Sequence, residues 1–217
     1  MNSTAEAFHD LYWYSDTWKW TFWQGVPTLK CPLDLWVYQE LLWLVRPQLV
    51  VELGTWAGGT ATFLADMMDL HAADRTSEVV TVDILNDEAF APHAESYPRL
   101  APFPVRIRPA HPRVTYLHGS SVDAAVVQSI VGKARGKQRV MVIADSDHSY
   151  EHAYQELQQY HDLVTPGSWF IMEDTDGHGP RQAVARFVSE HPEFSVDVQC
   201  EKFHMTFNPG GYLRRRM

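Results

Sequence analysis

Short apolar runs recur along the chain from residue 49 onward, each followed by a polar or glycine-rich stretch. Their residues are largely β-branched or aromatic, which is typical of inner strands that are buried on both faces of a parallel sheet. The runs predict strands at residues 49–53, 79–82, 114–117, 140–144 and 169–172. Two closing strands are predicted at about 194–199 and 202–207.

Amphipathic segments lie between these runs and predict helices. The clearest are expected at residues 34–46, 61–70, 150–163 and 181–190, and Asp34 is the expected N-cap of the first. Strands that alternate with helices indicate a parallel sheet covered on both faces, so the predicted fold class is α/β and Rossmann-like. We expect an N-terminal aromatic-rich helical segment at 1–46 and one main domain at 47–217. Residues 85–112 carry six prolines and are interpreted as an insertion or lid.

Aromatic residues are concentrated near the N-terminus. The stretch contains Tyr12, Trp13, Tyr14, Trp18, Trp20, Phe22 and Trp23. Two interpretations stay open: the segment packs over the sheet or against a second subunit, or its rings form a wall of a substrate site, because flat rings and sugars stack on aromatic faces. The first is preferred, and a homo-oligomer is therefore a possible assembly.

Composition narrows the possible partners. The net charge of −9 argues against nucleic acid or an anionic membrane as a partner, and Arg214–Arg216 is interpreted as a solvated tail. No apolar run approaches the roughly 20 residues that a membrane-spanning helix needs. Cys31 and Cys200 lack metal-ligand spacing, so a reduced pair in a cytoplasmic protein is expected, although a disulfide stays open.

Acidic residues follow two of the predicted strands directly. Asp145 and Asp147 come after the strand at 140–144, and Glu173 and Asp174 come after the strand at 169–172. The carboxyl ends of parallel strands meet at one edge of a sheet, where ligands bind in open α/β folds. Carboxylates that converge there indicate a divalent cation with oxygen ligands.

A glycine-rich turn follows the first predicted strand, in Glu52-Leu53-Gly54-Thr55-Trp56-Ala57-Gly58-Gly59. Glycine allows the backbone to approach a ligand closely, and Asp83 at the end of the next strand is placed to accept hydrogen bonds from ribose hydroxyls. Together they predict a nucleotide-type cofactor. Ser120 and Ser121 follow the third strand and could contact an adenine ring, although a helix-capping turn explains them nearly as well.

These residues resemble class I S-adenosylmethionine-dependent methyltransferases, whose fold is a seven-stranded Rossmann-like sheet with a C-terminal antiparallel strand pair. A closer resemblance, over nearly the whole chain, is to the cephalosporin hydroxylase-like and rhamnosyl O-methyltransferase group. The matching phrases are Trp23-Gln24-Gly25-Val26-Pro27, Lys30-Cys31-Pro32-Leu33-Asp34-Leu35-Trp36, Gly119-Ser120-Ser121, Asp145-Ser146-Asp147-His148-Ser149, Glu173-Asp174-Thr175, Glu201-Lys202-Phe203 and Thr206-Phe207-Asn208-Pro209-Gly210-Gly211.

The resemblance implies roles for individual residues. Mg²⁺ would be held by Asp145, Glu173 and Asp174, and His148, three residues beyond the first ligand, would be the general base. Asp147 in place of Asp145 is the alternative ligand. The cofactor, S-adenosylmethionine, would be bound by residues at the ends of the first four strands: Glu52, Gly54, Thr55, Gly58, Asp83, Ser120, Ser121, Asp145 and Asp147.

The chemistry of this residue set fits methyl transfer to an alcohol. A cation bound to a hydroxyl favours the alkoxide and positions it, and a histidine accepts protons near neutral pH. We therefore expect a magnesium-dependent O-methyltransferase that acts on a sugar, an oligosaccharide or a glycosylated natural product. A phenolic or antibiotic acceptor, a silent cofactor-binding partner protein and a nicotinamide-dependent oxidoreductase are the alternatives; the last lacks a G-x-G-x-x-G turn.

Overall fold

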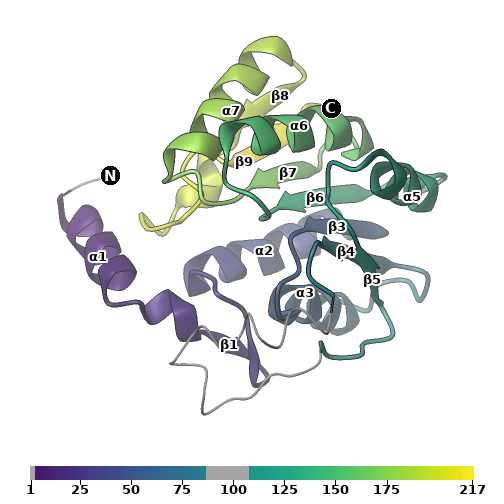
Figure 1. The fold of residues 1–217 in the computed structure, drawn as a ribbon, viewed down its shortest axis with the longest axis horizontal. Helices are drawn as coiled ribbons and strands as arrows, with labels where there is room; N and C mark the ends of the chain where they lie inside the picture. Colours follow the sequence, from purple (N-terminus) through teal and green to yellow (C-terminus); the bar gives the residue numbers. More distant parts are fainter. Residues whose placement is uncertain (1–2, 87–107) are drawn as a thin grey trace.

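The computed structural model describes residues 3–86 and 108–217, and most of the predicted insertion at 85–112 lies outside them. Seven strands within the described residues form one sheet in the order β5-β4-β3-β6-β7-β9-β8 (Figure 1). The strands are β3 (Leu49–Leu53), β4 (Glu78–Asp83), β5 (Val114–His118), β6 (Val140–Ala144), β7 (Trp169–Met172), β8 (Phe194–Val196) and β9 (Tyr212–Arg215). The first five are parallel, and β9 runs antiparallel to both β7 and β8. The predicted Rossmann-like α/β class with a C-terminal antiparallel pair is confirmed.

Helices cover both faces of the sheet. Helices α2 (Pro32–Val45) and α3 (Gly59–Leu70) pack on one face, and α5 (Ala124–Ala134), α6 (Tyr150–Tyr160) and α7 (His178–Glu190) pack on the other. Short 3₁₀ turns, η3 (His161–Leu163) and η4 (Val198–Glu201), link elements on the way. Every residue of β3, β6 and β7 is buried, as expected for inner strands that face helices on both sides. The described helices are too short or too polar to cross a bilayer.

The N-terminal segment forms a separate small layer at one side of the sheet (Figure 1). It consists of α1 (Ser3–Tyr14), the turn η1 (Thr17–Trp20) and a short hairpin whose two strands, β1 (Phe22–Trp23) and β2 (Val26–Pro27), have two residues each. Trp13 stacks on Trp18 at 5.0 Å between ring centroids, and both meet the edge or face of Phe207. Part of the aromatic stretch therefore packs on the C-terminal segment of the same chain, whereas Trp23 packs on Phe63 of α3 and Tyr14 and Trp20 are exposed.

The first long helix begins earlier than predicted. Cys31, not Asp34, is its cap, because Pro32 occupies the first helical position, where its fixed φ fits and its missing N–H costs nothing. The Asp34 carboxylate is buried instead and accepts hydrogen bonds from the C-terminal segment. Its donors are Thr206 Oγ1 at 2.5 Å, Phe207 N at 3.0 Å and the Tyr212 hydroxyl at 2.8 Å.

The prediction for the C-terminal strands was partly wrong. The last strand is Tyr212–Arg215, and residues 202–207 do not form a strand. Arg214 and Arg215 thus lie within the sheet and not in a solvated tail: Arg215 donates to the Val164 carbonyl at 2.6 Å, and the Arg214 guanidinium lies over the Trp169 ring. Both cysteines are buried and free.

Candidate active site

The acidic residues after β6 and β7 meet at the carboxyl edge of the sheet, as the strand pattern predicts. Ala144 pairs with Met172 in parallel register, and Glu173 N donates to the Ala144 carbonyl at 2.9 Å. Gly54, at the end of β3, passes so close that a Cβ there would meet the Asp145 carbonyl oxygen at 1.8 Å. Only glycine fits at this crossing, which explains why the turn after β3 carries one.

Asp145, His148 and Asp174 form one compact cluster. His148 Nε2 lies 3.4 Å from Asp145 Oδ1, and its Nδ1 lies 3.4 Å from Asp174 Oδ2. Their possible ligand atoms all lie within 4.8 Å of one another. Asp147 is not part of the cluster: its carboxylate accepts from Ser149 N in its own turn. The structure thus brings together His148 with Asp145 and Asp174 and leaves Asp147 apart.

A buried lysine occupies the space between two of the expected metal ligands. Lys30 Nζ contacts both Asp145 Oδ2 and Glu173 Oε2, the latter at 2.5 Å. Burial alone lowers the pKa of Lys30, but the charges of the two carboxylates outweigh it, so the pKa is raised and the side chain is an ammonium ion. Sequence reasoning missed this residue. A lysine between apolar neighbours in the phrase Lys30-Cys31-Pro32 was the available signal.

The remaining charges of the cluster are strongly perturbed. Burial, and then the charge of Asp145, raise the pKa of Glu173 well above its usual value and that of Asp174 to about 6. A hydrogen bond to Asp145 raises the pKa of His148 to about 9. Glu173 Oε1 is buried and makes no hydrogen bond to any described residue. The pKa of Asp145 is lowered despite burial, mainly by the charge of Lys30. Perturbed pKa values and an unpartnered buried oxygen are typical of functional sites.

A pocket of about 580 Å³ opens beside the cluster, along the ends of β3, β4, β5 and β6. Six of the predicted cofactor-binding residues line it: Gly54, Asp83, Ser120, Ser121, Asp145 and Asp147. The pocket also contains Trp56, Ile84, Leu85 and His152. This is the position where nucleotides bind in Rossmann-like sheets, beyond the carboxyl ends of the strands.

Asp83 has a structural task at the rim of this pocket. Its Oδ2 accepts from the backbone N–H groups of Thr55 at 3.1 Å and Trp56 at 2.6 Å, and its Oδ1 accepts from Leu85 N. The carboxylate therefore holds the turn after β3 in place. Its Oδ2, which also lies 3.5 Å from the Arg108 guanidinium, is fully used, whereas Oδ1 retains a lone pair for a further donor.

The other predicted cofactor-binding residues lie behind the pocket wall. Glu52 is buried, accepts from Thr81 Oγ1 at 2.5 Å, and burial raises its pKa to about 8. Thr55 Oγ1 shares a hydrogen bond with the same threonine. Gly58 is the N-cap of α3 with φ +79°, and a Cβ there would lie 2.9 Å from the Tyr116 hydroxyl. None of the three lines the pocket.

Ser121 belongs to a hydrogen-bond network that the sequence did not reveal. The buried Glu156 accepts from Ser121 Oγ at 2.5 Å and from Ser146 Oγ at 2.6 Å, and His152 Nε2 lies 2.9 Å from Ser121 Oγ. These contacts link the loops after β5 and β6 to helix α6. The network fixes the shape of the pocket floor, because each of its polar groups has a buried partner.

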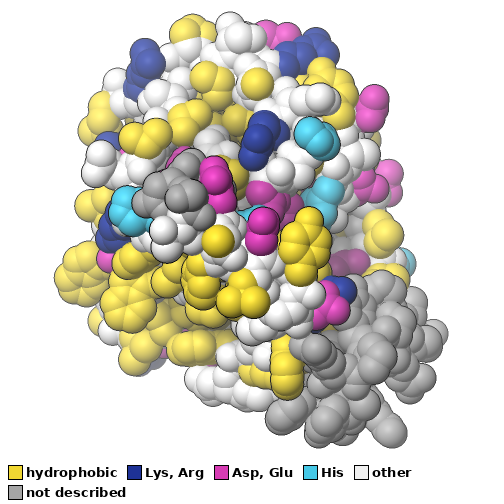
Figure 2. Space-filling view, turned by 90° about the vertical axis from the view of Figure 1, so that its left-hand side faces the viewer, with side chains coloured by type: hydrophobic (Ala, Val, Ile, Leu, Met, Phe, Trp, Pro, Cys, Tyr) yellow, Lys and Arg dark blue, Asp and Glu magenta, His cyan; other side chains and the backbone are white. Residues whose placement is uncertain are grey.

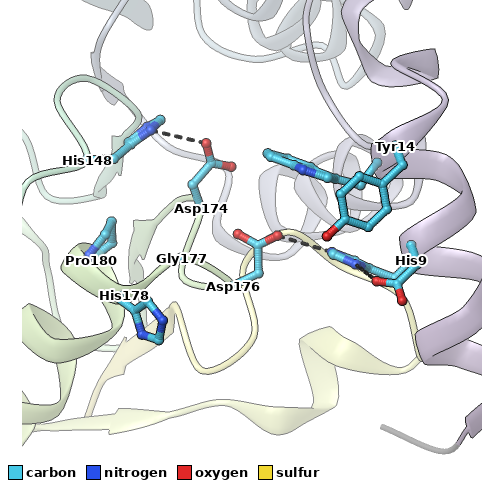
Figure 3. A pocket seen from close by; sticks show the side chains of 10 residues that line it. His9, Tyr14, His148, Asp174, Asp176, Gly177, His178 and Pro180 are labelled. Atoms are coloured by element: carbon cyan, nitrogen blue, oxygen red, sulfur yellow. Dashed lines mark hydrogen bonds and ion pairs between the residues drawn. The ribbon is translucent and has the colours of Figure 1, made fainter.

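A second pocket, of about 320 Å³, lies on the other side of the cluster (Figure 3). His148 and Asp174 line it from the loops after β6 and β7, His178 lines it from the start of α7, and Trp13 and Tyr14 line it from α1. Asp176 in this pocket pairs with His9 of α1 at 3.1 Å. Figure 2, which views this side of the molecule, shows acidic and histidine side chains gathered beside hydrophobic ones. The cluster thus borders two pockets, through Asp145 on one side and Asp174 on the other.

Comparison with known proteins decides the family. Residues 13–216 match the family described as rhamnosyl O-methyltransferase/CmcI. The chain belongs to this family. Rhamnosyl O-methyltransferases of Mycobacterium leprae and Mycobacterium tuberculosis are each 30% identical to it over 99% of this chain, covering 92% and 86% of their own lengths. The predicted family and enzyme class, an O-methyltransferase, are confirmed.

Solved structures agree on the fold. A CmcI structure with Mg and SAM superposes with a TM-score of 0.67 at 21% identity, over 91% of this chain and 77% of that one. An O-methyltransferase from Bacillus cereus in complex with SAH gives a TM-score of 0.52 at 18% identity, over 90% and 82% of the two chains. The rhamnosyl O-methyltransferase/CmcI family fold is therefore common to proteins of low sequence identity.

Proposed function

We propose that the protein transfers the methyl group of S-adenosylmethionine to a hydroxyl of a sugar, with Mg²⁺ held at the carboxylate cluster. The observation that carries the proposal is the position of Asp145, His148 and Asp174 between two pockets. A methyl donor in one pocket and an acceptor in the other would meet at these side chains. Such an approach matters because methyl transfer from a sulfonium proceeds in line and depends on positioning.

The residues of the larger pocket fit S-adenosylmethionine. Gly54 lines the pocket at the glycine turn, and Asp83 Oδ1 offers a lone pair at the place that a ribose occupies in related folds. Ser120 and Ser121 lie farther along the same edge, on the adenine side of such an arrangement. We propose Glu52, Thr55 and Gly58 as support for this wall, since they hold its turn from behind.

The cluster fits Mg²⁺ by the nature of its donors. Asp145, Glu173 and Asp174 supply only oxygen, which this hard cation prefers, and Glu173 Oε1 has no partner among the described residues. Two features of the described residues do not fit a three-carboxylate site as it stands: the Lys30 ammonium lies between Asp145 and Glu173, and Glu173 is outside the group of ligand atoms formed by Asp145, His148 and Asp174. When bound, the ion supplies a positive charge that lowers the pKa of a coordinated hydroxyl.

His148 is the proposed proton acceptor. Its ring is 46% exposed toward the smaller pocket, and Asp145 and Asp174 flank its two nitrogens and fix its orientation. A pKa of about 9 keeps the ring protonated at neutral pH without a metal. A neighbouring dication would oppose this charge and lower the pKa toward the range in which histidine accepts protons.

The smaller pocket suits a sugar acceptor. The exposed Tyr14 offers an aromatic face, and Asp176 and His178 offer hydrogen-bonding groups for hydroxyls. The family relatives named rhamnosyl O-methyltransferase support the same substrate class. A rhamnoside is therefore the first acceptor to examine.

The proposal is tested with S-adenosylmethionine that carries a deuterated methyl group and a panel of rhamnosides, other glycosides and catechols, read by mass spectrometry. We expect label on a glycoside hydroxyl, transfer that stops with a chelator, and recovery when Mg²⁺ is added. Label on catechols alone would replace the sugar acceptor with a phenolic one. Transfer that persists in chelator would contradict the metal assignment.

A further inference from the structure

A second group of possible metal ligands lies far from the active site. It consists of His161 at the start of η3, His191 at the end of α7 and Glu193 just before β8. The segment that follows η3 lies beside the first residue of β6, because Thr165 N donates a hydrogen bond to the Val140 carbonyl. The active-site cluster follows the other end of β6. Five strand residues at about 3.3 Å each separate the two groups by roughly 15 Å.

The three side chains are already gathered. Their possible ligand atoms lie within 4.8 Å of one another, and the two imidazole rings have centroids 4.4 Å apart. His191 Nδ1 lies 3.1 Å from Glu193 Oε1. A tetrahedral zinc site, with bonds of about 2.0–2.1 Å, separates its ligand atoms by about 3.4 Å. Small rotations of the side chains would therefore close the site.

The tautomer of His161 leaves a lone pair available to a metal. Its Nδ1 lies 3.1 Å from the Leu157 carbonyl and 3.0 Å from the Gln158 carbonyl. A carbonyl only accepts hydrogen bonds, so Nδ1 carries the proton and Nε2 is free to bind a cation. A backbone carbonyl on the second ring nitrogen is the usual support of metal-binding histidines.

His191 has a comparable support in Gln158. The Gln158 amide nitrogen lies 3.1 Å from His191 Nε2 and also donates to the Tyr154 hydroxyl at 3.0 Å and toward Glu190 at 3.5 Å. A half-turn of the amide gives up these two bonds and brings the amide oxygen to the ring. With the oxygen toward the ring, Nε2–H donates to it and Nδ1 faces Glu193 as a ligand. Phe187 stacks on the His191 ring at 4.3 Å, which limits its rotation.

The surroundings favour a cation of borderline softness. Two imidazoles and one carboxylate are zinc donors, whereas Mg²⁺ and Ca²⁺ prefer oxygen alone. Asp162 Oδ1 lies 3.5 Å from His161 Nε2 and is available as a further oxygen ligand. The positive charge of Arg215, which donates to the Asp162 carbonyl at 3.2 Å, weakens the attraction without blocking the ligands.

We propose that His161, His191 and Glu193 form a zinc-binding site that ties the C-terminal ends of α6 and α7 together. The helices pack against each other along the sheet face, and their ends also meet through the His161–Phe187 ring contact and through Gln158, which lies between Glu190 and His191. A shared ion would hold this pair as a structural clamp. The site stands independently of the proposed methyl transfer.

The test uses full-length protein with Asp145→Asn, because the active-site cluster also offers zinc ligands. Calorimetric titration with Zn²⁺ is compared for this background alone and with His191→Gln, Glu193→Gln or His204→Gln added. His204 is exposed and outside the cluster, so it is the matched control. Circular dichroism checks that each variant is folded, and Glu193→Gln is the mildest change because that side chain is 39% exposed.

We expect one zinc per chain in the background and in the His204→Gln control. Affinity should fall about 100-fold with His191→Gln and about tenfold with Glu193→Gln, the range in which metal-site changes act. Zinc should also raise the midpoint of thermal unfolding in the background and not with His191→Gln. Equal zinc affinity in the His191→Gln and His204→Gln proteins, or no binding in the background, would overturn the proposal.

Discussion

Replacement of Lys30 by methionine tests whether the Lys30 ammonium compensates the negative charge of the carboxylate cluster. Methionine keeps most of the length of the side chain but removes the ammonium that contacts Asp145 and Glu173. Removal of one partner from a buried ion pair typically costs about 3 to 5 kcal/mol, because the remaining charge is left uncompensated. We therefore expect the metal-free Lys30→Met protein to lose about that much unfolding free energy.

A thermodynamic cycle that links metal binding to unfolding predicts that Lys30→Met also changes the Mg²⁺ affinity. In the metal-bound protein the dication compensates the carboxylates, so the substitution costs less there than in the metal-free protein. If the difference is at least about 1.4 kcal/mol, Mg²⁺ binds at least tenfold more tightly to Lys30→Met than to the wild type. Lys30 would then be a built-in cation that competes with the metal for Asp145 and Glu173.

Calorimetry with Mg²⁺ in saturating S-adenosylhomocysteine measures the affinity, and thermal unfolding with and without Mg²⁺ measures the stability. Lys19→Met is the control, because Lys19 pairs with the exposed Asp16 at 2.9 Å and such surface pairs contribute only about 0 to 1 kcal/mol. A folded Lys30→Met protein whose Mg²⁺ affinity is unchanged or weaker would refute the reasoning.

Four further predictions follow from the site and the fold. His148→Gln should lower methyl transfer by about 100-fold or more and leave the S-adenosylhomocysteine affinity within about twofold, as calorimetry would show; parallel losses would contradict a proton-accepting role. In metal-free protein the His148 ring should titrate near pH 9 by NMR and near or below 7 with Mg²⁺; because the folded pKa is raised, its contribution to stability is complete below about pH 6.5 and is lost as the pH rises toward 9. Tyr14→Ala should raise the acceptor KM about tenfold without a change in cofactor affinity, since Tyr14 lines only the smaller pocket, and an unchanged KM would move the acceptor elsewhere. Asp34→Ala should cost about 3 kcal/mol in urea unfolding, because three donors lose a buried acceptor, and a cost below about 1 kcal/mol would mean that water replaces it.

The inner strands were predictable because burial on both faces leaves a continuous apolar signal. β6 and β7 have the predicted boundaries, and the acids that follow them lie together because neighbouring parallel strands end at the same edge of the sheet. The glycine at position 54 was predicted to let the backbone approach a ligand; the structure shows that it lets the backbone approach the Asp145 carbonyl, a partner that could be known only from the structure.

The last strand could not be found by the same reasoning. Residues 202–207 alternate between polar and apolar side chains like a strand, but Met205 and Phe207 are buried against the aromatic N-terminal segment instead. Tyr212–Arg215 has only two apolar residues, and its arginines are accommodated by Trp169 and by backbone carbonyls of distant segments. Tertiary contacts, which no local pattern encodes, decide both cases.

Lys30 shows the same limit at the site. Its position in the chain is 115 residues from Asp145 and 143 from Glu173, and nothing in the local sequence states that the ammonium reaches them. The predicted ligand set named only carboxylates, so it omitted the cation that neutralises them in the structure. Asp145 was separable from Asp147 by strand position, because the residue directly after the strand stays at the sheet edge.

Crystals that contain Mn²⁺ in place of Mg²⁺, together with S-adenosylhomocysteine, test the central claim most directly. We predict one anomalous peak bound by oxygen atoms of Asp145, Glu173 and Asp174, the adenosine along Asp83, Ser120 and Ser121, and the sulfur directed toward the metal. A peak elsewhere, or a nucleotide outside that pocket with Asp145 and Glu173 still paired with Lys30, would contradict the account.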